Sequence, residues 1–211
     1  MACRKIDAVI FDFGNVLTFP NDHSGILSLI REIPLEEGLF LSIYRKNRPP
    51  FDRGTISIEE YWDNVFKELS VKNPEKIIPQ FIQKDTDDWT RINESVLKWQ
   101  SVLREQGYTT AVLSNLPEYY GMHFRQNFPW LKKFHEIIFS CDVDSIKPEP
   151  EIYKVCIDRL GIEPSRGLFL DDMKENVIAA REAGLHAEVF EYTENCTEFI
   201  KSKYSLPLFY Y

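Results

Sequence analysis

The stretch Asp7 to Leu17, DAVIFDFGNVL, constrains the fold of this chain more than any other. Its apolar run, Ala8 to Phe11, is followed by a turn that contains Gly14 and Asn15, and it is typical of a buried parallel strand. The run places Asp12 in a turn at the carboxyl end of that strand, where open α/β sheets bind ligands. A single carboxylate at such a position could also be a polar residue that merely ends a strand. The ends of later strands therefore decide between these interpretations.

Residues 22–88 show no strand pattern, and their apolar residues recur at helical spacing. Ser57 and Glu60 form a capping-box pattern that predicts the start of a helix. The Pro49-Pro50 and Asp52-Arg53-Gly54 stretches predict loops. We expect the aromatic side chains of this segment to serve mainly in core packing. The predicted helices cover residues 24–33, 36–45, 58–66 and 74–83.

Strand and helix patterns alternate in the remainder of the chain, which indicates βαβ units. Strands are predicted over residues 108–114, 136–140, 168–170 and 186–190, and helices over 94–106, 118–128, 150–160, 174–183 and 193–203. We therefore predict an α/β fold, a Rossmann-like parallel sheet with helices on both faces, plus an inserted α-helical cap. Residues 1–18 and 92–211 would form the core and residues 19–91 the cap. The aromatic end, Leu206 to Tyr211, is either a docked tail or an interface strip.

Charge and cysteine content exclude several classes of protein. The chain has 211 residues and a net charge of −8, which argues against nucleic-acid binding and requires any phosphate site to supply its own positive charge. The four cysteines, Cys3, Cys141, Cys156 and Cys196, are scattered and predict neither a zinc site nor a disulfide framework. No signal-peptide pattern or membrane-spanning run is visible, so we expect a cytoplasmic protein without a membrane partner, monomeric or homodimeric.

Four predicted strands are each followed by residues suited to chemistry. In chain order these are Asp12, Ser114 with Asn115, Lys147, and Asp171 with Asp172. A carboxylate can attack phosphorus to form an aspartyl-phosphate when Mg²⁺ and a lysine neutralise the charge of the reactants. Hydroxyl and main-chain donors can hold the phosphoryl oxygens. Together these residues predict phosphoryl transfer at the carboxyl edge of the sheet.

In order and spacing, these residues resemble the haloacid dehalogenase-like superfamily, in the subfamily with an α-helical cap after the first strand. The matching stretches are Val9 to Leu17, Val112 to Asn115, Lys147-Pro148, and Leu168 to Asp172 with Asn176. The resemblance implies that Asp12 is the nucleophile, that Ser114 and Asn115 hold the phosphoryl group, and that Lys147 bridges the nucleophile and the phosphate. It also implies that Asp12, Asp172 and the carbonyl of Gly14 bind Mg²⁺, with Asp171 indirect.

Gly14 departs from the pattern of the family phosphatases, which usually carry an acid–base Asp at this position. General acid–base catalysis contributes about 10²- to 10⁴-fold, so we expect its loss to be visible and Gly14→Asp to help poor leaving groups most. The Asp-x-Gly-Asn-Val turn is similar to a subgroup that includes glucose-1-phosphate phosphatases. The expected function is thus Mg²⁺-dependent hydrolysis of a small phosphomonoester, such as a sugar phosphate.

Other functions remain open. A 2-haloacid dehalogenase would share the fold and the nucleophile, but it needs no metal, and its relatives lack the paired acids. A catalytically weak binding or regulatory protein would account for Gly14, and a phosphomutase would also call for an acid–base residue. Substrate choice is expected to depend on cap residues, although the sequence favours a solvated surface charge over substrate contact for each arginine among them. The candidates are Tyr44, Arg45, Arg48, Arg53 and Trp62.

Overall fold

One parallel β-sheet forms the centre of the molecule. The computed structural model describes residues 5–207, and its strands are β1 (Ala8–Phe11), β2 (Thr109–Ser114), β3 (Glu136–Phe139), β4 (Gly167–Asp171) and β5 (His186–Val189). Their order, β3-β2-β1-β4-β5, places β1 in the middle, and every neighbouring pair is parallel. The predicted α/β class is confirmed.

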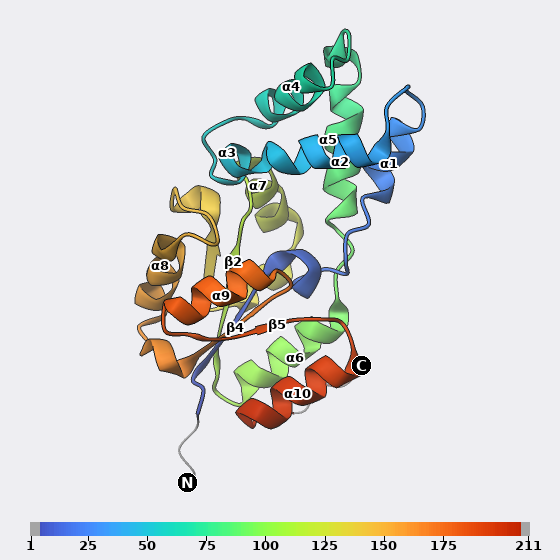
Figure 1. The fold of residues 1–211 in the computed structure, drawn as a ribbon. Coiled ribbons are helices and arrows are strands. Elements are labelled where there is room, and N and C mark those ends of the chain that lie inside the picture. Colours follow the sequence, from blue (N-terminus) through green and yellow to red (C-terminus); the bar gives the residue numbers. More distant parts are fainter. Residues whose placement is uncertain (1–4, 208–211) are drawn as a thin grey trace.

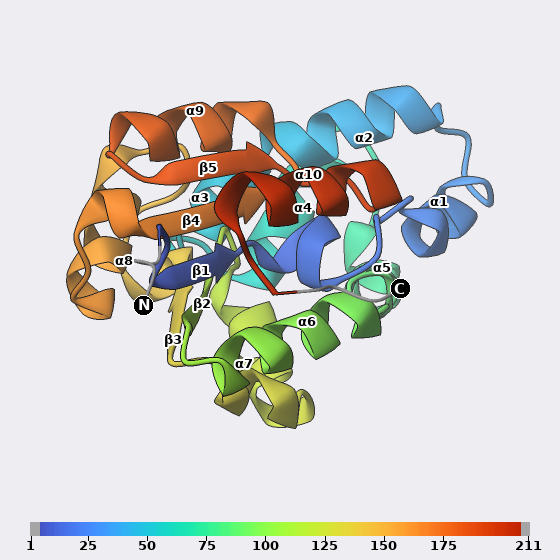
Figure 2. The ribbon, with the colours of Figure 1, turned by 90° about the horizontal axis from the view of Figure 1, so that it is seen from below.

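Helices cover both faces of the sheet, which explains why β1 and β4 are apolar along their length. Every residue of these two strands is buried. Val9 and Phe11 face the layer that contains α6 and α10, whereas Ile10 faces the layer of α8 and α9 (Figure 2). The central strand is therefore held on both faces, and its carboxyl end is a rigid position for a side chain.

The helices after residue 93 agree with the sequence prediction to within one residue at each end. They are α6 (Glu94–Glu105), α7 (Glu118–Asn127), α8 (Pro150–Leu160), α9 (Lys174–Glu182) and α10 (Glu194–Tyr204). Short 3₁₀ turns cover Pro129–Lys133, Ser140–Asp142 and Pro164–Arg166. The end of the aromatic tail, residues 208–211, lies outside the described part of the chain.

The segment between the first two strands, residues 19–91, is helical and is called the helical insert below. It contains α1 (Ser24–Ile30), α2 (Glu37–Lys46), α3 (Arg48–Asp52), α4 (Ile58–Glu68), a 3₁₀ turn (Pro74–Lys76) and α5 (Ile78–Asp88). Ser57 caps α4 as predicted, by accepting a hydrogen bond from the main-chain nitrogen of Glu60 at 3.2 Å.

Three details of the helical insert differ from the sequence prediction. The first helix, α1, ends at Ile30, three residues before its predicted end. The prolines of the expected loop lie in the first turn of α3. Proline is tolerated there because N–H groups of the first turn have no hydrogen-bond partner within the helix. The last helix of the insert starts after Pro74–Lys76 and extends five residues past Gln83, to Asp88. Local residue preferences favoured a loop and a shorter helix, and packing against α1 and α4 overrides them.

The chain enters and leaves the helical insert at one point. Thr18 and Ile92 form an antiparallel bridge, and hydrogen bonds from Phe19 N to Arg91 O (2.7 Å) and from Asn93 N to Leu17 O (2.9 Å) flank it. Helices α1 to α5 gather above the carboxyl ends of the strands (Figure 1). Within residues 5–207, no helix is long and apolar enough to cross a membrane, and Cys141, Cys156 and Cys196 are free thiols.

Candidate active site

Asp12 directly follows the central strand and is 7% exposed. Its main-chain nitrogen donates to the carbonyl of Leu170 at 2.9 Å, which extends the β1–β4 ladder to this residue. The Oδ1 atom accepts a hydrogen bond from Phe13 N at 2.7 Å and lies 2.9 Å from Lys147 Nζ. Within residues 5–207, Oδ2 has no hydrogen-bond partner. The carboxylate is thus fixed by one oxygen while the other remains available.

Lys147 lies beside Asp12, as the sequence predicts, and is 3% exposed. Its ammonium group contacts Asp12 Oδ1 at 2.9 Å and donates to Asp171 Oδ2 at 2.7 Å and to the carbonyl of Leu113 at 3.1 Å. Burial opposes the charge, but the two carboxylates outweigh it and raise the pKa of Lys147 well above its ordinary value. Lys147 is therefore a fixed cation at the floor of the site.

The two acidic residues at the end of β4 have different surroundings. Asp171 is fully buried, and its carboxylate accepts hydrogen bonds from Lys147, Met173 N (2.8 Å) and Asn176 Nδ2 (3.0 and 3.1 Å). Asp172 is half-buried and, among residues 5–207, accepts a hydrogen bond from one other residue, Asn15, whose Nδ2 lies at 2.8 Å. Asp171 therefore orients Lys147, whereas Asp172 keeps a free oxygen.

Asn15 and Asn176 position these carboxylates, a function that the sequence analysis did not assign to them. Asn15 adopts a left-handed backbone conformation (φ 59°), which asparagine tolerates better than most residues. Its Oδ1 atom accepts from Asn21 N at 2.9 Å, so the amide nitrogen faces Asp172. The signal was present in the sequence, since both asparagines lie within the stretches that carry the family resemblance.

Ser114 and Asn115 both reach the site, but their side chains have different environments. Ser114, the last residue of β2, is 3% exposed and lines the cavity beside Asp12. The side chain of Asn115 binds the main chain of Lys147 at both ends, with Nδ2 donating to O (2.8 Å) and Oδ1 accepting from N (2.6 Å). Asn115 therefore holds the loop that presents Lys147.

Three carboxylates meet at this edge of the sheet. Asp12, Asp171 and Asp172 each offer an oxygen, and these oxygens lie within 4.8 Å of one another. Burial raises the pKa of Asp12 to about 7, against the effect of Lys147, and the charges of Asp171 and Asp172 raise it further. A divalent cation would relieve this repulsion, and oxygen donors are the ligands that Mg²⁺ prefers. The residues present fit such an ion.

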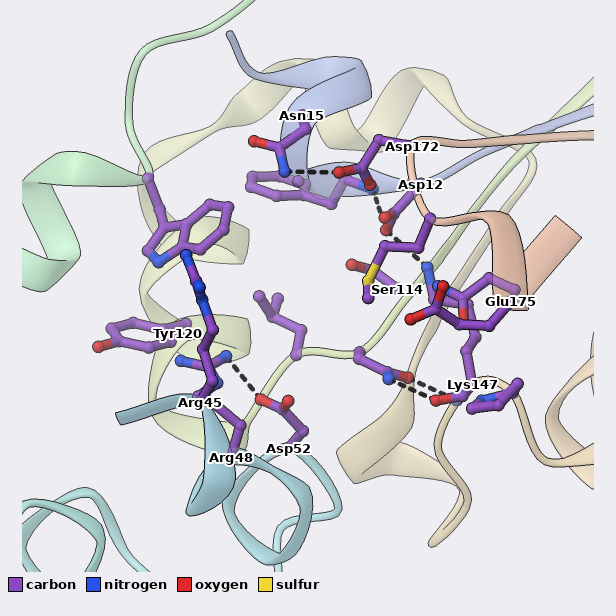
Figure 3. A pocket seen from close by; sticks show the side chains of 18 of the residues that line it. Asp12, Asn15, Arg45, Arg48, Asp52, Ser114, Tyr120, Lys147, Asp172 and Glu175 are labelled. Atoms are coloured by element: carbon purple, nitrogen blue, oxygen red, sulfur yellow. Dashed lines mark hydrogen bonds and ion pairs between the residues drawn. The ribbon is translucent and has the colours of Figure 1, made fainter. Parts of the chain in front are cut away.

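A cavity of about 360 Å³ lies between the strand ends and the helical insert. Of the five predicted cap candidates, Tyr44, Arg45 and Arg48 line it, together with His23 and Trp89, which the sequence analysis did not place there. Figure 3 shows the arginines approaching from the side opposite Asp12 and Asp172. The other two candidates do not line it: Trp62 packs among the insert's aromatic rings, and Arg53 pairs with Glu149.

The two cavity arginines differ in how their charge is neutralised. Arg48 donates to Asp52 at 2.6 Å and lies over the ring of Phe51. Arg45 is exposed and, within the described chain, has neither an ion pair nor a hydrogen bond from its side chain. Arg45 is therefore a cation of the cavity wall that remains free to bind an anion.

Buried polar contacts join the helical insert to the rest of the molecule. Asp85 of α5 is fully buried and accepts hydrogen bonds from the hydroxyls of Tyr44 in α2 and Tyr120 in α7. Ser140 donates to the carbonyl of Asp52, which adds a second contact between the insert and the strand-end loops. These contacts hold the insert over the strand ends and enclose the cavity.

Comparison with known proteins identifies the family. Residues 6–184 match the model of the haloacid dehalogenase-like hydrolases, so the chain belongs to this family. It is 24% identical to mouse acyl-CoA dehydrogenase family member 10, over 97% of this chain but only 20% of that protein. It is also 29% identical to a phosphoglycolate phosphatase of Haemophilus influenzae, over 57% of this chain and 54% of that protein. The chain thus spans only part of these relatives.

Solved structures show the same fold. A haloacid dehalogenase family enzyme of Bacteroides thetaiotaomicron, bt-2542, is 22% identical and superposes with a TM-score of 0.72 over 93% of this chain and 99% of that one. That enzyme has also been solved in complex with magnesium and inorganic phosphate (TM-score 0.64, 23% identity, 92% and 98% of the two chains). The L-2-haloacid dehalogenase of Xanthobacter autotrophicus has a TM-score of 0.66 at 16% identity, over 96% and 85% of the two chains.

Proposed function

We propose that this chain is a Mg²⁺-dependent phosphatase that hydrolyses a small phosphomonoester through an aspartyl-phosphate on Asp12. One observation carries the proposal: Asp12 has one oxygen fixed by Phe13 N and Lys147, and a second oxygen without a partner among residues 5–207. A nucleophile needs this combination of fixed orientation and a free lone pair.

In the first step, Asp12 Oδ2 attacks phosphorus while the bond from phosphorus to the leaving oxygen breaks. The leaving group departs with the electron pair and takes a proton from solvent. In the second step, water attacks the phosphorus of the aspartyl-phosphate, the bond to Asp12 breaks, and the proton of the water passes to solvent. The products are the free alcohol or acid and inorganic phosphate, and Asp12 is regenerated.

The neighbours of Asp12 neutralise and hold the transferring group. Lys147 places a buried positive charge within 2.9 Å of the nucleophile, where it would also contact a phosphoryl oxygen. The hydroxyl of Ser114 and the main-chain nitrogen of Asn115 would hold the remaining oxygens, since the Asn115 side chain is committed to Lys147. This refines the substrate-binding role that the family resemblance implies for Asn115.

The ligands of Mg²⁺ would be Asp12, Asp172 and the carbonyl of Gly14. Asp171 would not bind the ion directly, because its carboxylate contacts Lys147 and Asn176. When bound, the ion supplies positive charge against both the nucleophile and the phosphoryl oxygens. The phosphoglycolate phosphatase relatives support a substrate of this class, and the magnesium and phosphate complex of the Bacteroides enzyme supports the cofactor.

We also propose that residues 1–18 and 92–211 act as a catalytic core and residues 19–91 as its cap. The bridge between Thr18 and Ile92 supports a boundary at this point, because the chain leaves and re-enters the core side by side. A cap that closes over the site would exclude water from the reacting centre.

We also propose that the protein is located in the cytoplasm and that the chain is a monomer or a homodimer.

The test is phosphate release from a panel of phosphomonoesters with and without Mg²⁺. We expect turnover that chelator abolishes and that Asp12→Asn lowers by at least about 10³-fold, since the covalent route is lost. Asp22→Asn, an exposed residue of the helical insert, is the matched control and should retain activity. Halide release that survives chelator would identify a dehalogenase. Binding of Mg²⁺ and fluoroaluminate without any turnover would identify a catalytically weak binding protein.

A further inference from the structure

The side-chain space at position 14 is occupied by another residue. Gly14 has ordinary backbone angles (φ −67°, ψ 135°), so the turn itself does not require glycine. A Cβ atom at this position would lie 2.9 Å from Cζ3 of Trp89, which is closer than real side chains approach, and 3.5 Å from Cη2, which is ordinary contact. The indole of Trp89, which follows α5, therefore occupies the space that a side chain at position 14 would need, and it would have to shift to admit one.

This packing removes the acid–base residue from the site, and most other titratable groups of the cavity wall are already engaged. Tyr44 and Tyr120 donate to Asp85, and Asp52 is paired with Arg48. Each of these groups has its proton or its charge committed to a partner within the protein. None of them is free to deliver a proton to a leaving oxygen.

Only two other acid–base side chains line the cavity without a hydrogen bond in the described residues, His23 and Glu175. Burial lowers the pKa of His23, and the cations Arg45 and Arg48 lower it further, against the effect of Asp85 and Asp22. Its Nδ1 atom is also buried without a partner, so the doubly protonated ring is disfavoured. Glu175 is exposed in the first turn of α9, so its side chain is in contact with solvent rather than held toward the reacting centre by the protein.

We propose that Trp89 is a specificity residue: it fills the position of the general acid, and the enzyme consequently selects phosphoryl compounds with a weakly basic leaving group, above all acyl phosphates. This inference rests on the proposed function. Asp12 Oδ2 forms a bond to phosphorus as the bond to the acyl oxygen breaks, and the carboxylate leaves with the electron pair without needing a proton. An alkoxide needs a proton in the transition state, and the described residues that line this site leave no free donor positioned for it.

The lack of an acid–base residue at position 14 also affects the second step. Hydrolysis of the aspartyl-phosphate has no side chain to take the proton of the attacking water, so this step is slow for every substrate. A reactive acyl or aryl phosphate therefore phosphorylates Asp12 faster than water hydrolyses the aspartyl-phosphate. The enzyme should release the first leaving group in a burst before steady turnover, which is a sign of accumulated covalent intermediate.

The experiment compares kcat/KM for acetyl, p-nitrophenyl, phenyl and ethyl phosphate in the presence of Mg²⁺. We expect the wild type to favour acetyl phosphate over ethyl phosphate steeply, with a burst of p-nitrophenol equal to the enzyme concentration. The double variant Gly14→Asp/Trp89→Ala should raise activity on ethyl phosphate by about 10²-fold and change that on acetyl phosphate little, since general acid catalysis contributes at least this much. Trp89→Ala alone should keep the steep preference.

Gly14→Asp alone should lose activity on all four substrates, because the new side chain meets the Trp89 ring. This outcome is the opposite of the sequence-based expectation that Gly14→Asp would help poor leaving groups most, and the activity of the single variant decides between the two. His23→Gln and Glu175→Gln should leave the ratio of acetyl to ethyl phosphate unchanged.

Three results would overturn the inference. A flat dependence on the leaving group in the wild type would show that a proton donor exists. A selective loss of ethyl phosphate activity in His23→Gln or Glu175→Gln would identify that donor. Absence of the burst, a measurement that needs no variant to fold, would show that water attack is not slow. Failure of the proposed function is a separate result, namely no Mg²⁺-dependent turnover of any of the four compounds.

Discussion

The two walls of the cavity are built in different ways. The core wall, Asp12, Ser114, Lys147 and Asp172, comes from the ends of neighbouring strands and from the loop that Asn115 holds. The insert wall, Tyr44, Arg45, Arg48 and Trp89, comes from helices and from the residue after α5. Main-chain ladders fix the core wall to the sheet, whereas the insert wall depends on how helices pack against one another.

This difference suits the core wall to catalysis and the insert wall to substrate recognition. On the core wall, each charge is set by a hydrogen bond to the backbone or by a neighbouring strand end, so its geometry follows from the fold. On the insert wall, rings and one unpaired guanidinium face a cavity whose shape the helices determine. We therefore expect substitutions on the core wall to change the rate of reaction and those on the insert wall to change which substrate is accepted.

The largest expected effect comes from removing the carboxylate-paired cation of each wall and comparing the losses in kcat. Lys147→Met should lower kcat by about 10²- to 10³-fold, the usual loss when one group that stabilises the transition state is removed. It also leaves Asp171 buried and unpaired, which costs about 3–5 kcal/mol in the free energy of unfolding. Steady-state kinetics and urea unfolding measure the two effects.

Arg48→Met is the matched change on the insert wall, since Arg48 is also a cation paired with a carboxylate, although its side chain is 16% exposed. We expect a loss of stability of about 3 kcal/mol but a change in kcat of less than about tenfold, because Arg48 contacts no reacting atom in the proposed mechanism. An equal loss of kcat in both variants would remove the distinction between the two walls.

A smaller effect is expected at Arg45, the exposed cation of the insert wall. Arg45→Gln should raise KM by about tenfold for phosphomonoesters with a second anionic group, such as phosphoglycolate, because a charge-assisted hydrogen bond is lost. Substrates with a neutral organic group should respond little. Competition between these two kinds of substrate measures the effect directly.

Arg31→Gln provides the control for this substitution. Arg31 lies in the helical insert, pairs with Glu37 at 2.8 Å and does not line the cavity. If both variants change KM equally, the effect of Arg45 is general surface charge rather than recognition, and increasing salt should then abolish the difference from the wild type.

The smallest expected effect concerns Asp85, which joins both walls. Burial raises its pKa, against the effects of Arg48 and of the hydroxyls of Tyr120 and Tyr44. Its contribution to stability is therefore fully present below the unfolded pKa of about 3.9 and is lost as the pH rises through the raised folded pKa. Relative to Asp85→Asn, the wild type should lose stability between pH 4 and the raised folded pKa.

Urea unfolding of both proteins over this range measures that difference, and each unit of pKa difference corresponds to about 1.4 kcal/mol. Tyr120→Phe gives the control, because it removes a donor to the Asp85 carboxylate while leaving the acid in place. A stability difference that is independent of pH would show that Asp85 folds with an ordinary pKa.

The sequence predicted the core wall well, and particular residues show why. Asp12 follows an apolar run, Asp171 ends another, and parallel strands bring their carboxyl ends to one edge. Local patterns alone therefore place Asp12, Lys147 and Asp172 together. The same reasoning did not assign a role to Asn115 in holding Lys147, because the hydrogen bonds between them span 32 positions.

Short patterns along the sequence are enough to specify the parallel sheet and the residues at its carboxyl edge. The tertiary structure decided the rest. It brought Trp89 against Gly14, left Arg45 free in the cavity while Arg53 paired with Glu149, and joined Asp85 to Tyr120. The physical reason is that each of these contacts depends on the packing of elements far apart in the sequence, which no local pattern specifies.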